Sequence, residues 1–195
     1  WITAARQDAL ARVTAMGMPH RRDEYWRYTD PFSFTTRDVP DAAVFDNDEG
    51  PLFADVDRIK VVFVDGVFDA DASDDLTVAG LEIERLADVA TKDIHWAKDI
   101  FGVLENDGQT PVDRPLAALN TALAEDGIVI RATAKVAKPV NLIYLHNDVL
   151  SDATLHSVVR IEEGAEMTLL ETGPGAARLN KVLEVDVADG GTFHH

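Results

Sequence analysis

A chain of 195 residues with a formal net charge of −17 and no cysteine excludes several classes of function. The field of so acidic a chain repels phosphate backbones and anionic membranes, so we expect no nucleic-acid partner and no membrane partner. Without cysteine there is no disulfide, no thiol nucleophile and no thiolate metal ligand. The sequence shows no secretory signal and no apolar run near the roughly 20 residues of a membrane span, which favours a cytoplasmic protein.

The first predicted element is a helix from Ile2 to Met16. Apolar residues recur there at every third or fourth position, a spacing that places one buried stripe along a helix. Gly17 and Pro19 then end the helix, because glycine favours helix termini and proline cannot continue one.

The most distinctive motif follows, since Glu24 to Thr29 reads E-Y-W-R-Y-T. Aromatic and basic side chains interleaved in this way can dock on another protein by stacking and cation–π contacts. Alternatively, Trp26 and Tyr28 fasten the first helix to the rest of the fold while Glu24 pairs with Arg27. The candidate site residues, for docking or packing, are Glu24, Trp26, Arg27, Tyr28 and Thr29.

The next stretch contains a loop and a strand. Asp38 to Asp57 is acidic and punctuated by proline and glycine, which predicts a loop. Within it, Asp46 to Gly50 lacks the glycine and carboxylate spacing of a calcium loop. Ile59 to Val64 is predicted to be a strand that turns back at the Asp65-Gly66 pair.

Three further helices are predicted before residue 126. Two are expected over Leu81 to Val89 and Ile94 to Leu104. The third opens at Asp113 with an early proline. Its expected buried face consists of Leu116, Leu119 and Leu123. We therefore expect residues 1–126 to form a mainly helical N-terminal domain.

From residue 127 the apolar period changes to two, and a short pattern repeats. Val159 to Met167 is answered by Val185 to Phe193, 26 residues later, and a weaker copy starts at Ile128, 31 residues earlier. A strand-turn-strand unit that recurs in this way is typical of stacked coils. We interpret residues 127–195 as the first part of a β-helix core, with antiparallel hairpins of a sandwich as the alternative. The fold class is then α+β.

A search for chemistry in the sequence finds no catalytic residue and no metal site. There is no phosphate-binding glycine loop and no serine in a nucleophile elbow. His194 and His195 are adjacent, so on a strand they point to opposite faces. His146 and His156 can face each other across neighbouring strands, but two ligands make a weak site. These observations favour a scaffold or assembly subunit over an enzyme.

Several motifs together resemble the SufB/SufD family of iron–sulfur cluster assembly proteins, and most closely its SufD members. They are G-M-P at residues 17–19, E-Y-W-R-Y-T at 24–29, F-V-D-G at 63–66, L-N at 119–120 and I-E-E-G-A at 161–165. The similarity runs from about Ala4 to the end of the chain. The tryptophan motif is its most specific part.

This resemblance implies a helical N-terminal domain, a right-handed parallel β-helix and a later helical domain. It also implies a complex with a SufB-type protein and the ABC-type ATPase SufC, in which the complex as a whole builds the iron–sulfur cluster. We expect no cofactor on these 195 residues, which would end partway through the family's core. Pairing of two copies through the β-helix is a further arrangement that the resemblance allows. A glycan-binding or carbohydrate-active β-helix protein is the alternative function.

Overall fold

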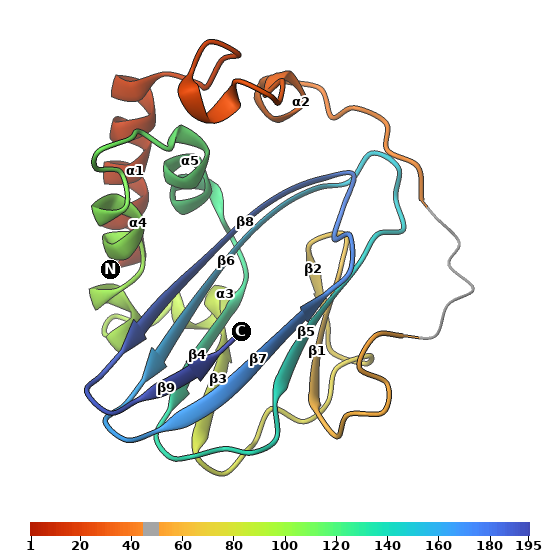
Figure 1. Ribbon diagram of the computed structural model, residues 1–195, viewed down its shortest axis with the longest axis vertical. Coiled ribbons are helices and arrows are strands. Elements are labelled where there is room, and N and C mark those ends of the chain that lie inside the picture. The colour runs from red at the N-terminus through yellow and green to blue at the C-terminus, as the bar shows by residue number, and fades with distance from the viewer. Residues whose placement is uncertain (45–50) are drawn as a thin grey trace.

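The computed structural model describes residues 1–44 and 51–195, so the Asp46 to Gly50 stretch lies outside the described residues. The fold is mixed α/β, with two sheets and a few mostly short helices (Figure 1). The helical elements are α1 (Ile2–Met16), η1 (Glu24–Trp26), α2 (Phe32–Thr35), α3 (Leu86–Val89), η2 (Trp96–Asp99), α4 (Val103–Asp107) and α5 (Pro115–Leu123). The strands are β1 (Ile59–Val64), β2 (Val67–Asp69), β3 (Leu81–Arg85), β4 (Ile128–Ala132), β5 (Val140–Leu145), β6 (Asp152–Ile161), β7 (Glu166–Thr172), β8 (Arg178–Val187) and β9 (Thr192–His194).

Both sheets are mixed, and the chain alternates between them. One sheet has the order β2-β1-β5-β7-β9 and the other the order β3-β4-β6-β8. From β4 to β7, each strand pairs in parallel with the strand two places later in the chain, and β1 pairs in parallel with β5. The antiparallel pairs are β1 with β2 and β3 with β4. The change to a period of two from residue 127 correctly indicates strands, since β4 to β9 all lie in that part of the chain.

The strand register confirms the stronger sequence repeat and corrects the weaker one. Val159 of β6 lies opposite Val185 of β8, and Met167 of β7 lies opposite Phe193 of β9. The partner of Val159 in β4 is Ile130 and not Ile128, so the start of the first copy is displaced by two residues, whereas Lys135 near its end lies opposite Glu166 as the repeat predicts. A two-residue shift keeps every side chain on the same face, which is why the apolar pattern alone could not exclude it.

The main hydrophobic core lies between the two sheets. Alternate residues of each strand point inward, and the largest fully buried ones include Phe63, Ile130, Leu142, Ile161 and Met167. Burial of a side chain of this size stabilises the fold by roughly 1.5–3 kcal/mol. Buried positions recur with a period of two in β7, whereas β4, β5 and β6 contain runs of consecutive buried residues. In β4 and β6 this is because the helices cover the outer face of the sheet at Val129 and Val158.

A second core joins the helices to the outer face of the β3-β4-β6-β8 sheet. Val129 and Val158, neighbours in that sheet, pack with Ile2 of α1, Leu86 of α3 and Phe101. Figure 1 shows α1, α4 and α5 together on that side of the molecule. Helix α1 has the bounds that the sequence predicted, from Ile2 to Met16.

The expectation of a mainly helical N-terminal part is wrong, because β1 and β3 contribute to the two sheets. Leu81–Arg85 is a strand with only one helical turn after it, and the 94–104 stretch holds two short helical pieces. Ile94, where the second of these helices was predicted to begin, is 81% exposed. Alternation in L-E-I-E-R fits a strand better than a helix, since its leucine and isoleucine share one face only at a period of two.

Among the described residues, no helix has both the length and the apolar character to cross a membrane.

Candidate functional site

The geometry around the aromatic motif begins where α1 ends. Gly17 takes φ +77° and donates its N–H to the carbonyl of Val13 at 2.9 Å, which satisfies the last turn of the helix. Buried Pro19 then fixes the direction of the chain toward η1. The motif therefore begins at a defined distance from α1, because the turn between them is short and packed.

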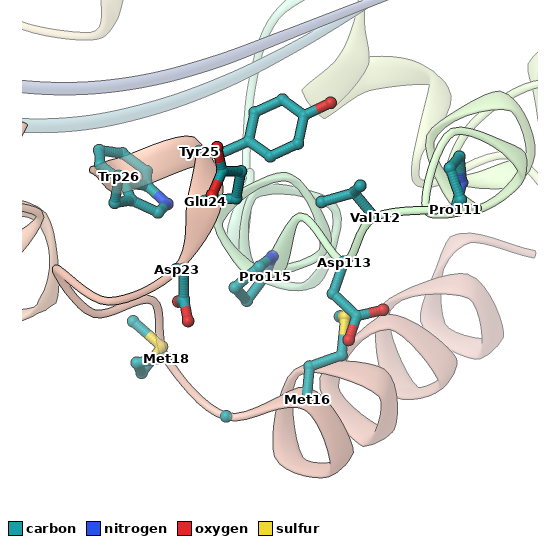
Figure 2. A pocket seen from close by; sticks show the side chains of 11 residues that line it. Met16, Met18, Asp23, Glu24, Tyr25, Trp26, Pro111, Val112, Asp113 and Pro115 are labelled. Carbon is teal, nitrogen blue, oxygen red and sulfur yellow. The ribbon is translucent and has the colours of Figure 1, made fainter. Parts of the chain in front are cut away.

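A cavity of about 330 Å³ lies between the end of α1, η1 and the loop before α5. Figure 2 shows side chains from these three segments around it. Pro115, the first residue of α5, is buried at the base of the loop, where its missing N–H costs no hydrogen bond. The lining residues are Met16, Gly17, Met18, Asp23, Glu24, Tyr25, Trp26, Pro111, Val112, Asp113 and Pro115.

The aromatic motif divides between the cavity and solvent. Glu24 and Trp26 line the cavity, and the Trp26 ring packs against Phe34 with centroids 6.1 Å apart. Tyr28 is 90% exposed, with the Arg27 guanidinium 5.5 Å from its ring centroid. Tyr28 therefore does not fasten α1 to the fold, which leaves Trp26 as the packing residue of the motif.

The remaining members of the motif face solvent. Arg27 lies 3.9 Å from Glu24, both side chains are largely exposed, and a pair of this kind contributes roughly 0–1 kcal/mol. Thr29 is exposed and donates its backbone N–H to the Trp26 carbonyl at 3.1 Å. The five candidate residues are thus close together in space, but only Glu24 and Trp26 belong to the cavity.

Most of the cavity residues were not candidates from the sequence, among them Tyr25 and Asp113. Tyr25 is 64% exposed, and the Arg114 guanidinium lies 6.0 Å from its ring centroid. Asp113 was expected to cap α5, but the N-cap position is Arg114 and Asp113 lines the cavity instead. The only sequence signal was the pair of prolines at 111 and 115, which indicates a rigid loop without revealing what it faces.

A buried ionic network lies beside the cavity, between α1, α4 and α5. Arg12 donates two hydrogen bonds to the carboxylate of Glu105, at 3.0 and 2.8 Å, and these bonds raise the pKa of the guanidinium. Thr121 donates a third at 3.0 Å. These contacts explain why Glu105 and Thr121 are buried while Leu123, an expected core residue, is 54% exposed.

A second buried pair fastens α4 to the sheet. Nε2 of His156 on β6 lies 2.7 Å from Glu184 on β8, and the Glu184 carboxylate also accepts the N–H groups of Gly102 and Glu105 at 2.7 Å each. The Phe101 ring covers His156 with centroids 4.3 Å apart. His156 is fully buried in this setting, where it contacts a carboxylate and not His146. The sequence allowed these two histidines to face each other, and the structure shows that they do not.

A third polar cluster lies between the sheets, next to β9. Burial raises the pKa of Glu171, but hydrogen bonds from Lys181 and Tyr144 outweigh it, so the net effect is a lowered pKa. Burial and the adjacent carboxylate raise the pKa of Tyr144, whose hydroxyl donates to Glu171 at 2.7 Å. His195 contacts the same carboxylate at 2.8 Å, whereas His194 lies near Glu166, as expected of adjacent residues on a strand.

The described residues contain no group of three histidine or carboxylate side chains placed to hold a metal ion. The carboxylates of the buried clusters are instead bound to arginine, lysine, histidine or backbone N–H groups. Their arrangement can hold elements of the fold together. The part of the site that is open to another molecule is the cavity beside Tyr25 and Trp26.

One comparison with known proteins identifies a family. Residues 1–142 match the family described as "SufBD protein N-terminal region". The matched range contains α1, the aromatic motif, the cavity and the first strands of both sheets. No curated protein matches the chain.

Proposed function

The chain belongs to the SufB/SufD family, whose members take part in iron–sulfur cluster assembly, and we propose that it is a SufD-like subunit of the assembly scaffold. In this proposal it pairs with a SufB-type protein and with the ATPase SufC. It does not catalyse a step alone, and it acts in the cytoplasm. The observation that carries the proposal is the family match over residues 1–142.

We further propose that the strands from β4 onward form the first coils of a right-handed parallel β-helix. The support is topological, because the chain moves from one sheet to the other at every strand and pairs in parallel with the strand two places on. The recurring turns add support, since Gly164 and Gly190 adopt nearly the same φ, +69° and +68°, at equivalent places. Such a solenoid offers long flat faces for pairing with a similar subunit.

The polar chemistry of the described residues supports a subunit that positions its partners. Its buried carboxylates make ion pairs and hydrogen bonds within the fold, as in the Glu105 and Glu184 networks. The cluster is then cargo of the whole complex, and no cofactor is assigned to these 195 residues. The absence of cysteine from the sequence fits a role in which a partner supplies the thiols.

The proposal is tested by co-expression of the complete reading frame that contains these residues with a SufB-type protein and a SufC-type ATPase. We expect the tagged protein to retain both partners through affinity and size-exclusion chromatography in stoichiometric amounts. Recovery of the protein without either partner, at concentrations where the partners themselves are soluble, would overturn the proposal. Binding to polysaccharide in the same preparation would favour the glycan-binding alternative.

A further inference from the structure

We propose that the cavity beside Tyr25 and Trp26 binds an arginine or lysine side chain presented by a partner protein. This inference goes beyond the proposed function, since it concerns the chemistry of one contact and holds whichever partner supplies it. It rests on the charge of the lining, on its aromatic and apolar walls, and on its size.

The charge of the lining is complementary to a cation. Asp23, Glu24 and Asp113 line the cavity, and none of its described lining residues is basic. Asp23 contacts His20 through both carboxylate oxygens, since one accepts the backbone N–H at 2.9 Å and the other lies 3.2 Å from Nδ1. Glu24 lies 3.9 Å from Arg27.

These contacts leave one carboxylate oxygen of Glu24 available in the cavity. Asp113 makes no side-chain hydrogen bond or ion pair within the described part of the chain. A basic group beside Asp113 or Glu24 gains charge-assisted hydrogen bonds of the kind that fix orientation at interfaces.

The walls suit the rest of such a side chain. Tyr25 and Trp26 present aromatic rings, on which a guanidinium or ammonium is held by cation–π attraction worth roughly 0.5–1 kcal/mol at an exposed site. Met16, Met18 and Val112 supply apolar surface for the methylene stem. Figure 2 shows these side chains on different sides of the same space. A long basic side chain is the common residue type that matches both kinds of wall.

The size and accessibility of the cavity favour one side chain over a larger ligand. Its volume of about 330 Å³ is at the low end of the range of roughly 300–1,000 Å³ that holds drug-sized molecules. Tyr25 is 64% exposed and Met18 is 40% exposed, so the entrance is open to a partner. The position of Trp26 against Phe34 gives the site one rigid wall.

The chain carries three tryptophans, which makes a direct test available. The probe is the peptide acetyl-Gly-Arg-Gly-amide, with the citrulline peptide, neutral but of nearly the same shape, as the matched ligand. The indole N–H signals of Trp1, Trp26 and Trp96 are followed by ¹H–¹⁵N NMR at low salt. Trp1 donates its indole N–H to Val89 at 3.2 Å, and neither it nor Trp96 lines the cavity, so both are internal references.

We expect saturable displacement of the Trp26 signal alone, with a Kd for the citrulline peptide at least about threefold higher. Asp113→Asn should raise the Kd of the arginine peptide about threefold, and Asp189→Asn, in an exposed turn, should leave it unchanged. Tyr25→Ala and Tyr28→Ala form a second matched pair, because Tyr28 lies outside the lining. If Asp113→Asn disturbs the fold, Glu24→Gln replaces it.

Three results would overturn the proposal: no displacement of the Trp26 signal, equal affinity for the two peptides, or equal effects of the members of each matched pair. These results are independent of co-purification with assembly partners. Failure of this inference therefore leaves the proposed function standing, and failure of the proposed function leaves the peptide measurement unaffected.

Discussion

The buried carboxylate of Glu184 gives the sharpest prediction about stability. Its side chain is 2% exposed and has three contacts of 2.7 Å, with Nε2 of His156 and with the N–H groups of Gly102 and Glu105. Glu184→Ala leaves all three polar groups buried without a partner. Each bond to a charged acceptor is worth roughly 1.5–3 kcal/mol, although such contributions are not additive.

We expect Glu184→Ala to lower the free energy of unfolding by about 3–5 kcal/mol, the usual cost of removing one partner from a buried ion pair. This cost lies at or below the lower end of the sum of the three bonds, about 4.5–9 kcal/mol, because such contributions are not additive. With a urea m-value of about 2–3 kcal/mol/M, the unfolding midpoint followed by far-UV circular dichroism falls by about 1–2 M.

Asp186→Ala is the matched control, since it removes a carboxylate two residues away on the same face of the same strand. That side chain is 46% exposed and lies 3.1 Å from Arg160, so its loss should cost about 0–1 kcal/mol. Equal losses from the two variants, or a loss below about 1 kcal/mol for Glu184→Ala, would refute the view that the buried network stabilises the contact of α4 with the sheet.

Two further predictions concern backbone crowding and pH. Gly127→Ala places a Cβ 2.0 Å from the His156 carbonyl oxygen and should lower the free energy of unfolding by more than about 3 kcal/mol. Gly164→Ala places its Cβ with nothing within 4 Å and should lower it by about 1–2 kcal/mol. Equal losses for the two variants in urea unfolding would contradict this. Because the folded pKa of Glu171 is lowered, its stabilising effect is present above its unfolded pKa and is lost as pH falls through the folded value. Glu171→Gln should therefore flatten the acid limb of the unfolding free energy between about pH 5 and 2, and Lys181→Met should move that limb to higher pH. Superimposable profiles for wild type and both variants would contradict the assignment.

The strands after residue 127 could be predicted because period-two alternation is a local property of the sequence. Burial in β7 follows the alternation, and the pairing of Val159 with Val185 follows directly from the repeat. The displacement at the start of the first copy could not be predicted, because a shift by two residues leaves the same side chains inward. Register at β4 is determined by tertiary contacts that a repeat pattern does not contain.

The buried faces of α4 and α5 were harder to predict, since these faces are partly polar. Asn120 is fully buried and donates to the Leu155 carbonyl at 3.0 Å, while Leu123, on the same helix, is 54% exposed. An apolar stripe assigns the wrong face to such a helix, because the energy of its packing comes from hydrogen bonds to the sheet. The burial of Glu105 could not be predicted for the same reason, because it depends on hydrogen bonds such as that from Arg12.

The candidate site could be predicted only in its first half. The motif at Glu24 to Thr29 stood out by composition, but the opposite wall comes from residues 111–115, and no local pattern connects the two segments. Tyr25 lies between the candidates Glu24 and Trp26 in sequence. Whether it lines the cavity depends on which side of η1 faces residues 111–115, and the sequence does not show this. Composition therefore located the site along the chain, and only packing showed which side chains form it.

The segment that carries the aromatic motif is also fastened to the sheet at its far end. Arg178, the first residue of β8, donates to the carbonyls of Thr36 at 2.8 Å and Ser33 at 3.3 Å, while its other nitrogens bind Asp152 at the start of β6. Figure 1 shows this segment passing the starts of both strands. One end of the cavity's aromatic wall is thus determined by α1 and the other by a guanidinium more than 140 residues away in sequence. Since the guanidinium is itself fixed by a carboxylate of the neighbouring strand, the shape of the cavity depends on β6 and β8 being paired, and the N-terminal segment and the parallel strands form one structural unit.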